Sequence, residues 1–261
     1  MISLSSAEIN AWIVAFFFPL ARVLAVLVSA PPFNNPALTV RIRLILGLAI
    51  TLAIAPALPP MPAVDPASGA GLLILAQQML IGFAMGFAVR LVLAAVDLAG
   101  SMISLQMGLG FATAYDPLTA GQTGVVSEFL GLLALLIFMA INGHLMVIAT
   151  LTHSFTAIPI GAALPETGSW LQLARSGALI FSSGLLLALP ILVALLVTNL
   201  ALAILSRAAP QLNLIVIGFP LTITLGFAGL VFGLSYLSQP IQQIFEYGLQ
   251  AMLGNFSPAA R

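Results

Sequence analysis

Long runs of apolar residues constrain this chain more than any other feature. An α-helix needs roughly 20 such residues to cross a membrane. We mark about six runs near that length, at residues 9–30, 38–58, 71–98, 125–151, 175–206 and 212–238. Strands of a membrane barrel would instead alternate in polarity over about ten residues. The sequence therefore predicts an all-α polytopic membrane protein of about six long helices, some of them kinked by prolines such as Pro19 and Pro190.

The scarcity of charge supports the same class. Of the 261 residues, 61% are hydrophobic and 5% are charged, whereas soluble domains carry roughly 25% charged residues. The chain has no lysine and a formal net charge of zero, so we expect no nucleic-acid partner. It also has no cysteine, which excludes thiol chemistry. Ser5 to Glu8 match a capping box that begins the first helix, and we expect no cleaved leader there.

One stretch between the third and fourth apolar runs cannot continue a membrane helix. Residues 106–124 read QMGLGFATAYDPLTAGQTG, with four glycines, a proline and the ionisable Asp116. Irregular backbone at membrane depth is tolerated only where protein buries it or water surrounds it. The stretch is therefore either a solvated loop or a segment held in a cavity that the helices build.

The run that leads into this stretch carries small and polar residues on one helical face. They are Gly82, Gly86, Arg90, Asp97, Ser101 and Ser104. Glycines four residues apart allow two helices to approach closely, and Gly229 and Gly233 repeat that spacing in the last run. The polar end of the face favours the cavity for residues 106–124.

Ionisable and polar residues inside apolar runs are candidates for function or for buried pairing. The candidate buried polar residues are Arg90, Asp97, Glu128, Asn142 and His144. Asp97 and Glu128 could form a proton relay with Arg90, although structural pairing is the simpler interpretation. Arg22, in the first run, either extends to the membrane surface, which is the simpler interpretation, or is paired inside the bundle.

The sequence contains no recognisable catalytic or cofactor motif. Patterns typical of zinc proteases, serine hydrolases, phosphate-binding loops and dinucleotide-binding turns are missing. His144 and His153 are separated by about two and a half helical turns, too far to hold one metal ion. We therefore expect no enzyme, no cofactor and no metal site.

Two classes of function remain open. A small-solute transporter would show related halves with broken helices at matching positions, and the chain has no convincing internal repeat. A subunit of a larger membrane assembly is favoured by the small-residue faces on two helices, the few charges and the glycine-rich loop.

Residues 207–220, which read RAAPQLNLIVIGFP, resemble the signature of the FliR family of flagellar export-gate proteins and their type III secretion counterparts. The resemblance includes the glycine-rich QMGLGFA at 106–112 with Asp116 and Pro117, the triplet at 142–144, and the length of the chain. The reading of residues 217–220 favours a flagellar protein, with a virulence injectisome gate as the alternative.

The resemblance implies an export gate of the bacterial inner membrane, in the flagellar basal body, that passes unfolded proteins outward. Its partners would be P-type and Q-type gate subunits, the A-type and B-type export components, unfolded substrates and membrane lipid. The family fold is like a P-type subunit, here residues 1–170, fused to a Q-type helical hairpin, here residues 171–261. The subunits would form a helical assembly in which some segments need not cross the bilayer.

The resemblance also implies roles for individual residues. The loop at about 106–121 would plug the closed pore, with Phe111 and Tyr115 as bulky fillers. The predicted plug residues are Gln106, Met107, Gly108, Leu109, Gly110, Phe111, Ala112, Tyr115, Asp116 and Pro117. Predicted packing and assembly residues are Gly82, Gly86, Gly229, Gly233, Pro210, Gln211, Asn213 and Pro220.

Overall fold

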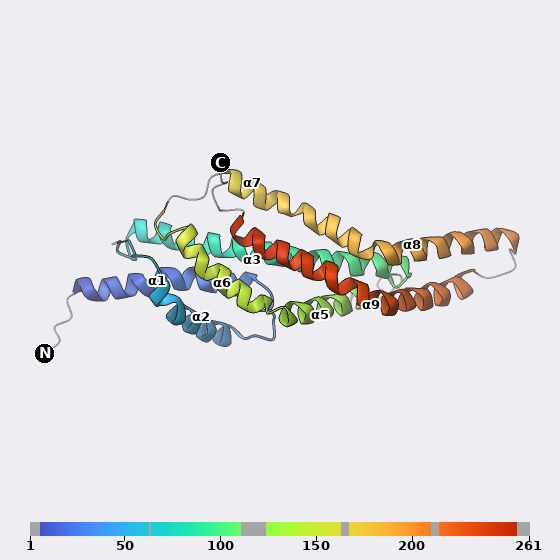
Figure 1. Cartoon of the computed structure of the whole chain (residues 1–261), viewed down its shortest axis with the longest axis horizontal. Coiled ribbons are helices and arrows are strands. Elements are labelled where there is room, and N and C mark those ends of the chain that lie inside the picture. The colour runs from blue at the N-terminus through green and yellow to red at the C-terminus, as the bar shows by residue number, and fades with distance from the viewer. Residues whose placement is uncertain (1–5, 63, 111–123, 163–166, 210–213, 255–261) are drawn as a thin grey trace. The chain divides into compact units, whose positions relative to one another are not determined.

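The computed structural model describes residues 6–62, 64–110, 124–162, 167–209 and 214–254 (Figure 1). These residues form helices and connecting turns, and none of them forms a strand. In chain order the elements are α1 (Ser6–Ser29), α2 (Val40–Ile54), the short 3₁₀ helix η1 (Ala55–Ala57), α3 (Gly69–Gln106), α5 (Val125–Ala140), α6 (Gly143–Ala157), α7 (Thr167–Ser176), α8 (Ala178–Ala208) and α9 (Leu214–Gly254). The predicted all-α class is confirmed.

Four helical stretches in the described part are long and apolar enough to cross a membrane. They are Val40–Ala57, Gly69–Gln106, Thr167–Ala208 and Ile217–Gly254. The interrupted pair α5 and α6 would make a fifth span if it crosses as one, and Val14–Ser29 is a shorter apolar helix. The number of spans is therefore four or five by length and composition, although each of the six predicted apolar runs is helical.

Asn142 explains why the fourth predicted run forms two helices. Its backbone is left-handed, with φ 57° and ψ 30°, a conformation that asparagine adopts more readily than most residues. Its carbonyl accepts the N–H groups of Leu145 at 2.9 Å and Met146 at 3.1 Å, which begins α6. The run at 125–151 is thus interrupted at the polar triplet that the sequence places there.

The chain forms two compact units. The first contains residues 1–90, 142–176 and 246–261, and the second contains residues 91–141 and 177–245. Each unit therefore takes residues from both sides of the predicted division at residue 170. The correspondence of residues 1–170 and 171–261 to P-like and Q-like parts remains a prediction.

The first unit is organised around Arg22, which is fully buried in α1. Its Nε donates to Oε1 of Gln78 in α3 at 2.8 Å. Its Nη1 donates to the carbonyl and the hydroxyl of Ser154 in α6, at 2.9 and 3.0 Å. Its Nη2 donates to the carbonyl of Ile158 at 2.9 Å, and the guanidinium carbon lies 4.4 Å from the ring centre of Phe155. One side chain thus joins three helices.

The partners of Arg22 are all uncharged within the described residues. Two of them are the carbonyls of Ser154 and Ile158 at the C-terminal end of α6, where a positive charge is favourable. The expectation that Arg22 extends to the membrane surface is wrong, because these fixed acceptors and the Phe155 ring replace water around the guanidinium.

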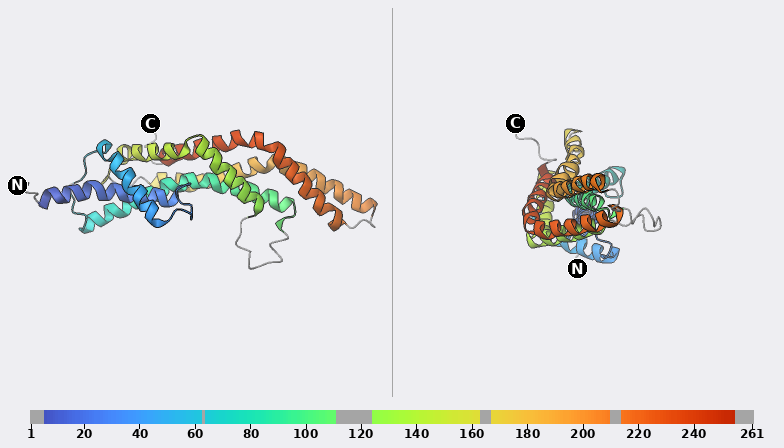
Figure 2. Two further views of the ribbon diagram at one scale, coloured as in Figure 1. Left: turned by 90° about the horizontal axis from the view of Figure 1, so that it is seen from below. Right: turned by 90° about the vertical axis from the view of Figure 1, so that its right-hand side faces the viewer.

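Gly82 and Gly86 lie where α3 packs against α1 in the first unit, and the two helices run side by side in both views (Figures 1 and 2). A Cβ on Gly82 would lie 2.5 Å from the carbonyl oxygen of Arg22 and 2.7 Å from Cβ of Ala25. A Cβ on Gly86 would overlap the hydroxyl of Ser29. The α1–α3 approach therefore depends on the missing side chains, and it brings Gln78 within reach of Arg22.

Replacing Arg22 with leucine is expected to destabilise the protein by about 3–5 kcal/mol, because it leaves Gln78 and a C-terminal carbonyl of α6 buried without a donor. At this chain length such a loss lowers the unfolding midpoint by roughly 10 °C, measured by thermal unfolding in detergent. The matched control is Arg41→Leu, since Arg41 is exposed. Equal midpoints for the two variants would contradict the central role of Arg22.

Candidate functional site: the root of the glycine-rich loop

The glycine-rich loop leaves α3 through a well-defined helix end. Gly108 has φ 84°, the left-handed region that glycine occupies without steric cost. The N–H of Gly108 bonds to the carbonyl of Leu105, and the N–H of Leu109 bonds to the carbonyl of Ser104, both at 3.0 Å. This pair of bonds is the Schellman motif, which satisfies the last carbonyls of a helix. Gly108 therefore ends α3 and sets the direction of the chain into the loop.

The same helix end is held by α9 within the second unit. The hydroxyl of Thr222 donates to the carbonyl of Met107 at 3.1 Å. The Met107 side chain is fully buried, and a Cβ on Gly226 would lie 2.5–2.7 Å from its Cγ, Sδ and Cε atoms. The missing side chain at Gly226 thus provides the space that Met107 occupies. One hydrogen bond and one close apolar contact attach the start of the loop to α9.

The end of the loop returns to the same place, at the start of α5. A Cβ on Gly124 would lie 3.1 Å from the hydroxyl of Ser104, and a Cβ on Gly100 would overlap the backbone of Ser127. The hydroxyls of Ser101 and Ser127 are 3.0 Å apart, and both bond to the carbonyl of Asp97. The C-terminal end of α3 and the N-terminal end of α5 are therefore in backbone contact.

We call these three segments the loop root: residues 97–109 of α3 and its cap, residues 124–128 at the start of α5, and residues 222–226 of α9 (Figure 1). The root fixes both ends of the loop within the second unit. The buried hydroxyl of Ser104 has no hydrogen-bond partner in the described part of the chain. The arrangement holds a loop on packed helices, which is how a protein presents a functional segment accurately.

Of the ten predicted plug residues, five lie within the described residues. Gln106 is half-buried at the end of α3, Met107 is fully buried, and Gly108, Leu109 and Gly110 follow the helix end. The other five, which are Phe111, Ala112, Tyr115, Asp116 and Pro117, lie outside the described residues. Met107 and Gly108 belong to the root that holds the loop, and the plug role of all ten residues remains a prediction.

The expected burial of five polar residues does not hold within this chain. Arg90, Asp97, Glu128 and Asn142 are exposed, and His144 is half-buried. The structure describes no ion pair among them. The Nδ1 atom of His144 is buried without a partner. Among the described residues, no group of three or more acidic or histidine side chains could hold a metal ion.

The assembly residues divide in a similar way. Pro210, Gln211 and Asn213 lie outside the described residues, and Pro220 is exposed in α9. Gly229 and Gly233 are half-buried. A Cβ on Gly229 would lie 3.5 Å from Ile191 of α8 and one on Gly233 3.8 Å from it, which is ordinary contact. Within the chain, these two glycines therefore have space for a Cβ atom, unlike Gly82 and Gly86.

The sequence interpretation missed several residues that build the loop root. Gly100 forms a small-residue pair with Ser104 at a spacing of four, the same signal that identified Gly82 and Gly86. Thr222 and Gly226 repeat that spacing in α9. Which helix each pair contacts follows only from the structure.

These helices define a polytopic α-helical membrane protein, and its glycine-rich stretch begins and ends on helices that pack against one another. Comparison with known proteins then gives the family. A sequence model of the family described as bacterial export proteins, family 1, matches residues 13–248. The chain belongs to this family, which confirms the resemblance seen in the sequence.

Individual relatives agree over nearly their whole lengths. The flagellar biosynthetic protein FliR of Pectobacterium carotovorum is 45% identical over 226 residues, which are 87% of this chain and 86% of that protein. The FliR of Escherichia coli K12 is 43% identical over 228 residues, 87% of each chain. The FliR of Bacillus subtilis is 30% identical over 244 residues, 91% of this chain and 93% of that protein.

Proposed function

We propose that this chain is a subunit of the flagellar export gate in the bacterial inner membrane, at the flagellar basal body. With P-type and Q-type subunits it forms a channel for unfolded flagellar proteins, and the loop held by the root closes that channel at rest. The observation that carries the proposal is the similarity, over most of the chain, to proteins named for flagellar biosynthesis. The same names favour the flagellum over the injectisome.

The exposed carboxylates of the second unit support the proposal that this chain assembles with other subunits. Asp97 and Glu128 are exposed on helices α3 and α5, which are otherwise apolar. An ionised carboxylate facing lipid is costly, so such residues normally face a partner or a water-filled path. Asp97 belongs to the loop root, because its carbonyl accepts bonds from Ser101 and Ser127. The exposed polar groups therefore lie next to the loop, where a channel for unfolded chains would need polar surface.

The apolar surface supports the same proposal. Large apolar side chains on α9 and α5 are exposed, including Phe232 at 84% and Val125 at 71%. A surface of this kind needs lipid or the apolar helices of other subunits to cover it. P-type and Q-type subunits would supply such helices, and the A-type and B-type export components would join the complete apparatus.

The loop itself is tested by a short deletion. Removing residues 111–114 while keeping the Gly108 helix end is expected to leave assembly intact and to make the gate leak. The measurement is ion conductance or small-solute entry in cells that co-express the partner subunits. The control deletion removes residues 163–166, between α6 and α7, and should not leak. An unchanged conductance for the 111–114 deletion, in an assembled complex, would exclude a plug.

The assembly face is tested at Gly229 and Gly233. Leucine at either position is expected to reduce co-purification of the P-type and Q-type subunits at least tenfold, because the added side chain keeps a neighbouring helix away. Within the chain a Cβ at either position meets only ordinary contacts, and co-purification is compared between variants with equal thermal unfolding midpoints. The control is Gly254→Leu, where a Cβ meets nothing within 4 Å. Normal co-purification of both variants would remove these glycines from the interface.

A further inference from the structure

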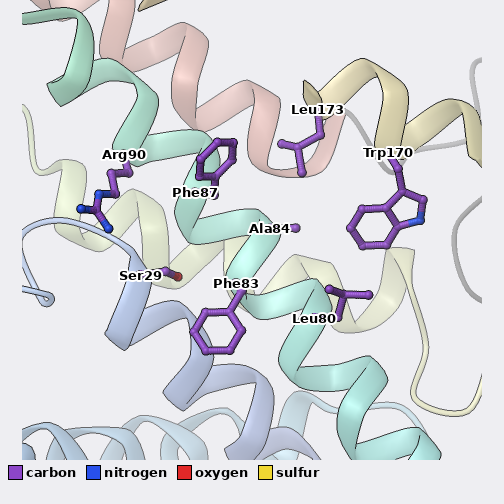
Figure 3. A pocket seen from close by; sticks show the side chains of 8 residues that line it. All are labelled: Ser29, Leu80, Phe83, Ala84, Phe87, Arg90, Trp170 and Leu173. Atoms are coloured by element: carbon purple, nitrogen blue, oxygen red, sulfur yellow. The ribbon is translucent and has the colours of Figure 1, made fainter. Parts of the chain in front are cut away.

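An apolar groove with a cation at one end lies in the first unit, outside the loop root. It occupies about 340 Å³ between α3 and α7, beside the end of α1. Figure 3 shows Phe83 and Phe87 of α3 along one side, Trp170 and Leu173 of α7 on the other, and Ala84 between them. Arg90 lies at the end away from Trp170. The lining is almost entirely apolar apart from this guanidinium.

The guanidinium of Arg90 is open for a ligand. Arg90 is exposed, and the structure describes no hydrogen bond or ion pair for it within the residues it covers. Arg22 and Arg43 differ from it, because Arg22 is enclosed by its partners and Arg43 donates to the carbonyls of Phe33 and Leu38. A planar guanidinium beside apolar surface is suited to a phosphate, which it can bind with two parallel hydrogen bonds.

Arg90 lies about one bilayer thickness from the start of α3. Arg90 lies 21 residues after Gly69, the first residue of α3, so the helix rises about 31 Å between them. That length equals the roughly 30 Å hydrocarbon thickness of a bilayer. A polar turn precedes Gly69, in which the Ser68 hydroxyl bonds to the carbonyl of Asp65. If this turn lies at one surface of the membrane, Arg90 lies at the other.

The lining of the groove suits a hydrocarbon chain, because aromatic and aliphatic side chains line both of its sides. An acyl chain is thin enough to lie between Phe83 and Trp170 along Ala84. The phenylalanine side chains are 40–45% exposed and can contact it directly.

We propose that this groove binds one anionic phospholipid, with an acyl chain between α3 and α7 and the phosphate on Arg90. The lipid covers apolar surface that the chain leaves open and neutralises the one cationic residue of α3. The site belongs to the first unit and is independent of the proposed pore loop.

Lipid titrations of the full-length protein in detergent, followed by native mass spectrometry, test the site. The probes are phosphatidylglycerol and phosphatidylcholine with matched chains. The wild type should bind one phosphatidylglycerol roughly five to ten times more tightly than phosphatidylcholine, the contribution expected of one arginine. Arg90→Gln should abolish that preference, whereas Arg41→Gln, on an exposed arginine away from the groove, should keep it. Ala84→Leu should weaken both lipids, because it fills the floor of the groove.

Several results would overturn the proposal. They are equal binding of the two lipids by the wild type, an unchanged preference in Arg90→Gln, or unchanged binding in Ala84→Leu. If Arg90→Gln does not fold, the wild-type comparison and Ala84→Leu still decide the question. A photo-crosslinker at Phe87 in cells should label lipid. Labelling of a partner polypeptide instead would assign the groove to a partner helix and reject the lipid.

Discussion

The buried guanidinium of Arg22 is the interaction on which the first unit depends. Its hydrogen bonds join α1 to Gln78 of α3 and to the C-terminal end of α6. Two local features make these bonds possible: Gly82 and Gly86 bring α3 close to α1, and the left-handed Asn142 begins α6 as a separate helix. A buried guanidinium without a carboxylate partner is stable only when hydrogen-bond acceptors surround it. The packing of the first unit holds those acceptors in place.

The second unit uses a different device, close backbone contact, to hold the glycine-rich loop. Gly100 and Gly124 allow α3 and α5 to meet, Gly226 leaves space for Met107, and Gly108 ends α3 in the required direction. The glycines in the described root serve packing and helix termination. In the proposed gate, both ends of the loop would therefore start from fixed positions on packed helices.

Much of the fold could be predicted from the sequence, since apolar runs and glycine spacing are local signals. The interruption at Asn142 and the close face at Gly82 and Gly86 belong to this class. The role of Arg22 could not be predicted, because two of its acceptors are main-chain carbonyls 132 and 136 residues away, and every residue carries a carbonyl. The exposure of Asp97 and Glu128 could not be predicted either, because it depends on how the helices pack against one another. At the loop root, the spacing of Gly100 and Ser104 was visible, but not that they meet α5.

The central claim is that the loop after Gly108 lies in the path of exported proteins. The chain has no cysteine, so a single introduced thiol reports on one position. Tyr115→Cys, carrying a thiol-reactive crosslinker, is expected to form an adduct with an export substrate stalled in the assembled gate. Phe232→Cys, on the exposed face of α9, should not. An adduct at position 232 with none at position 115 would contradict the account.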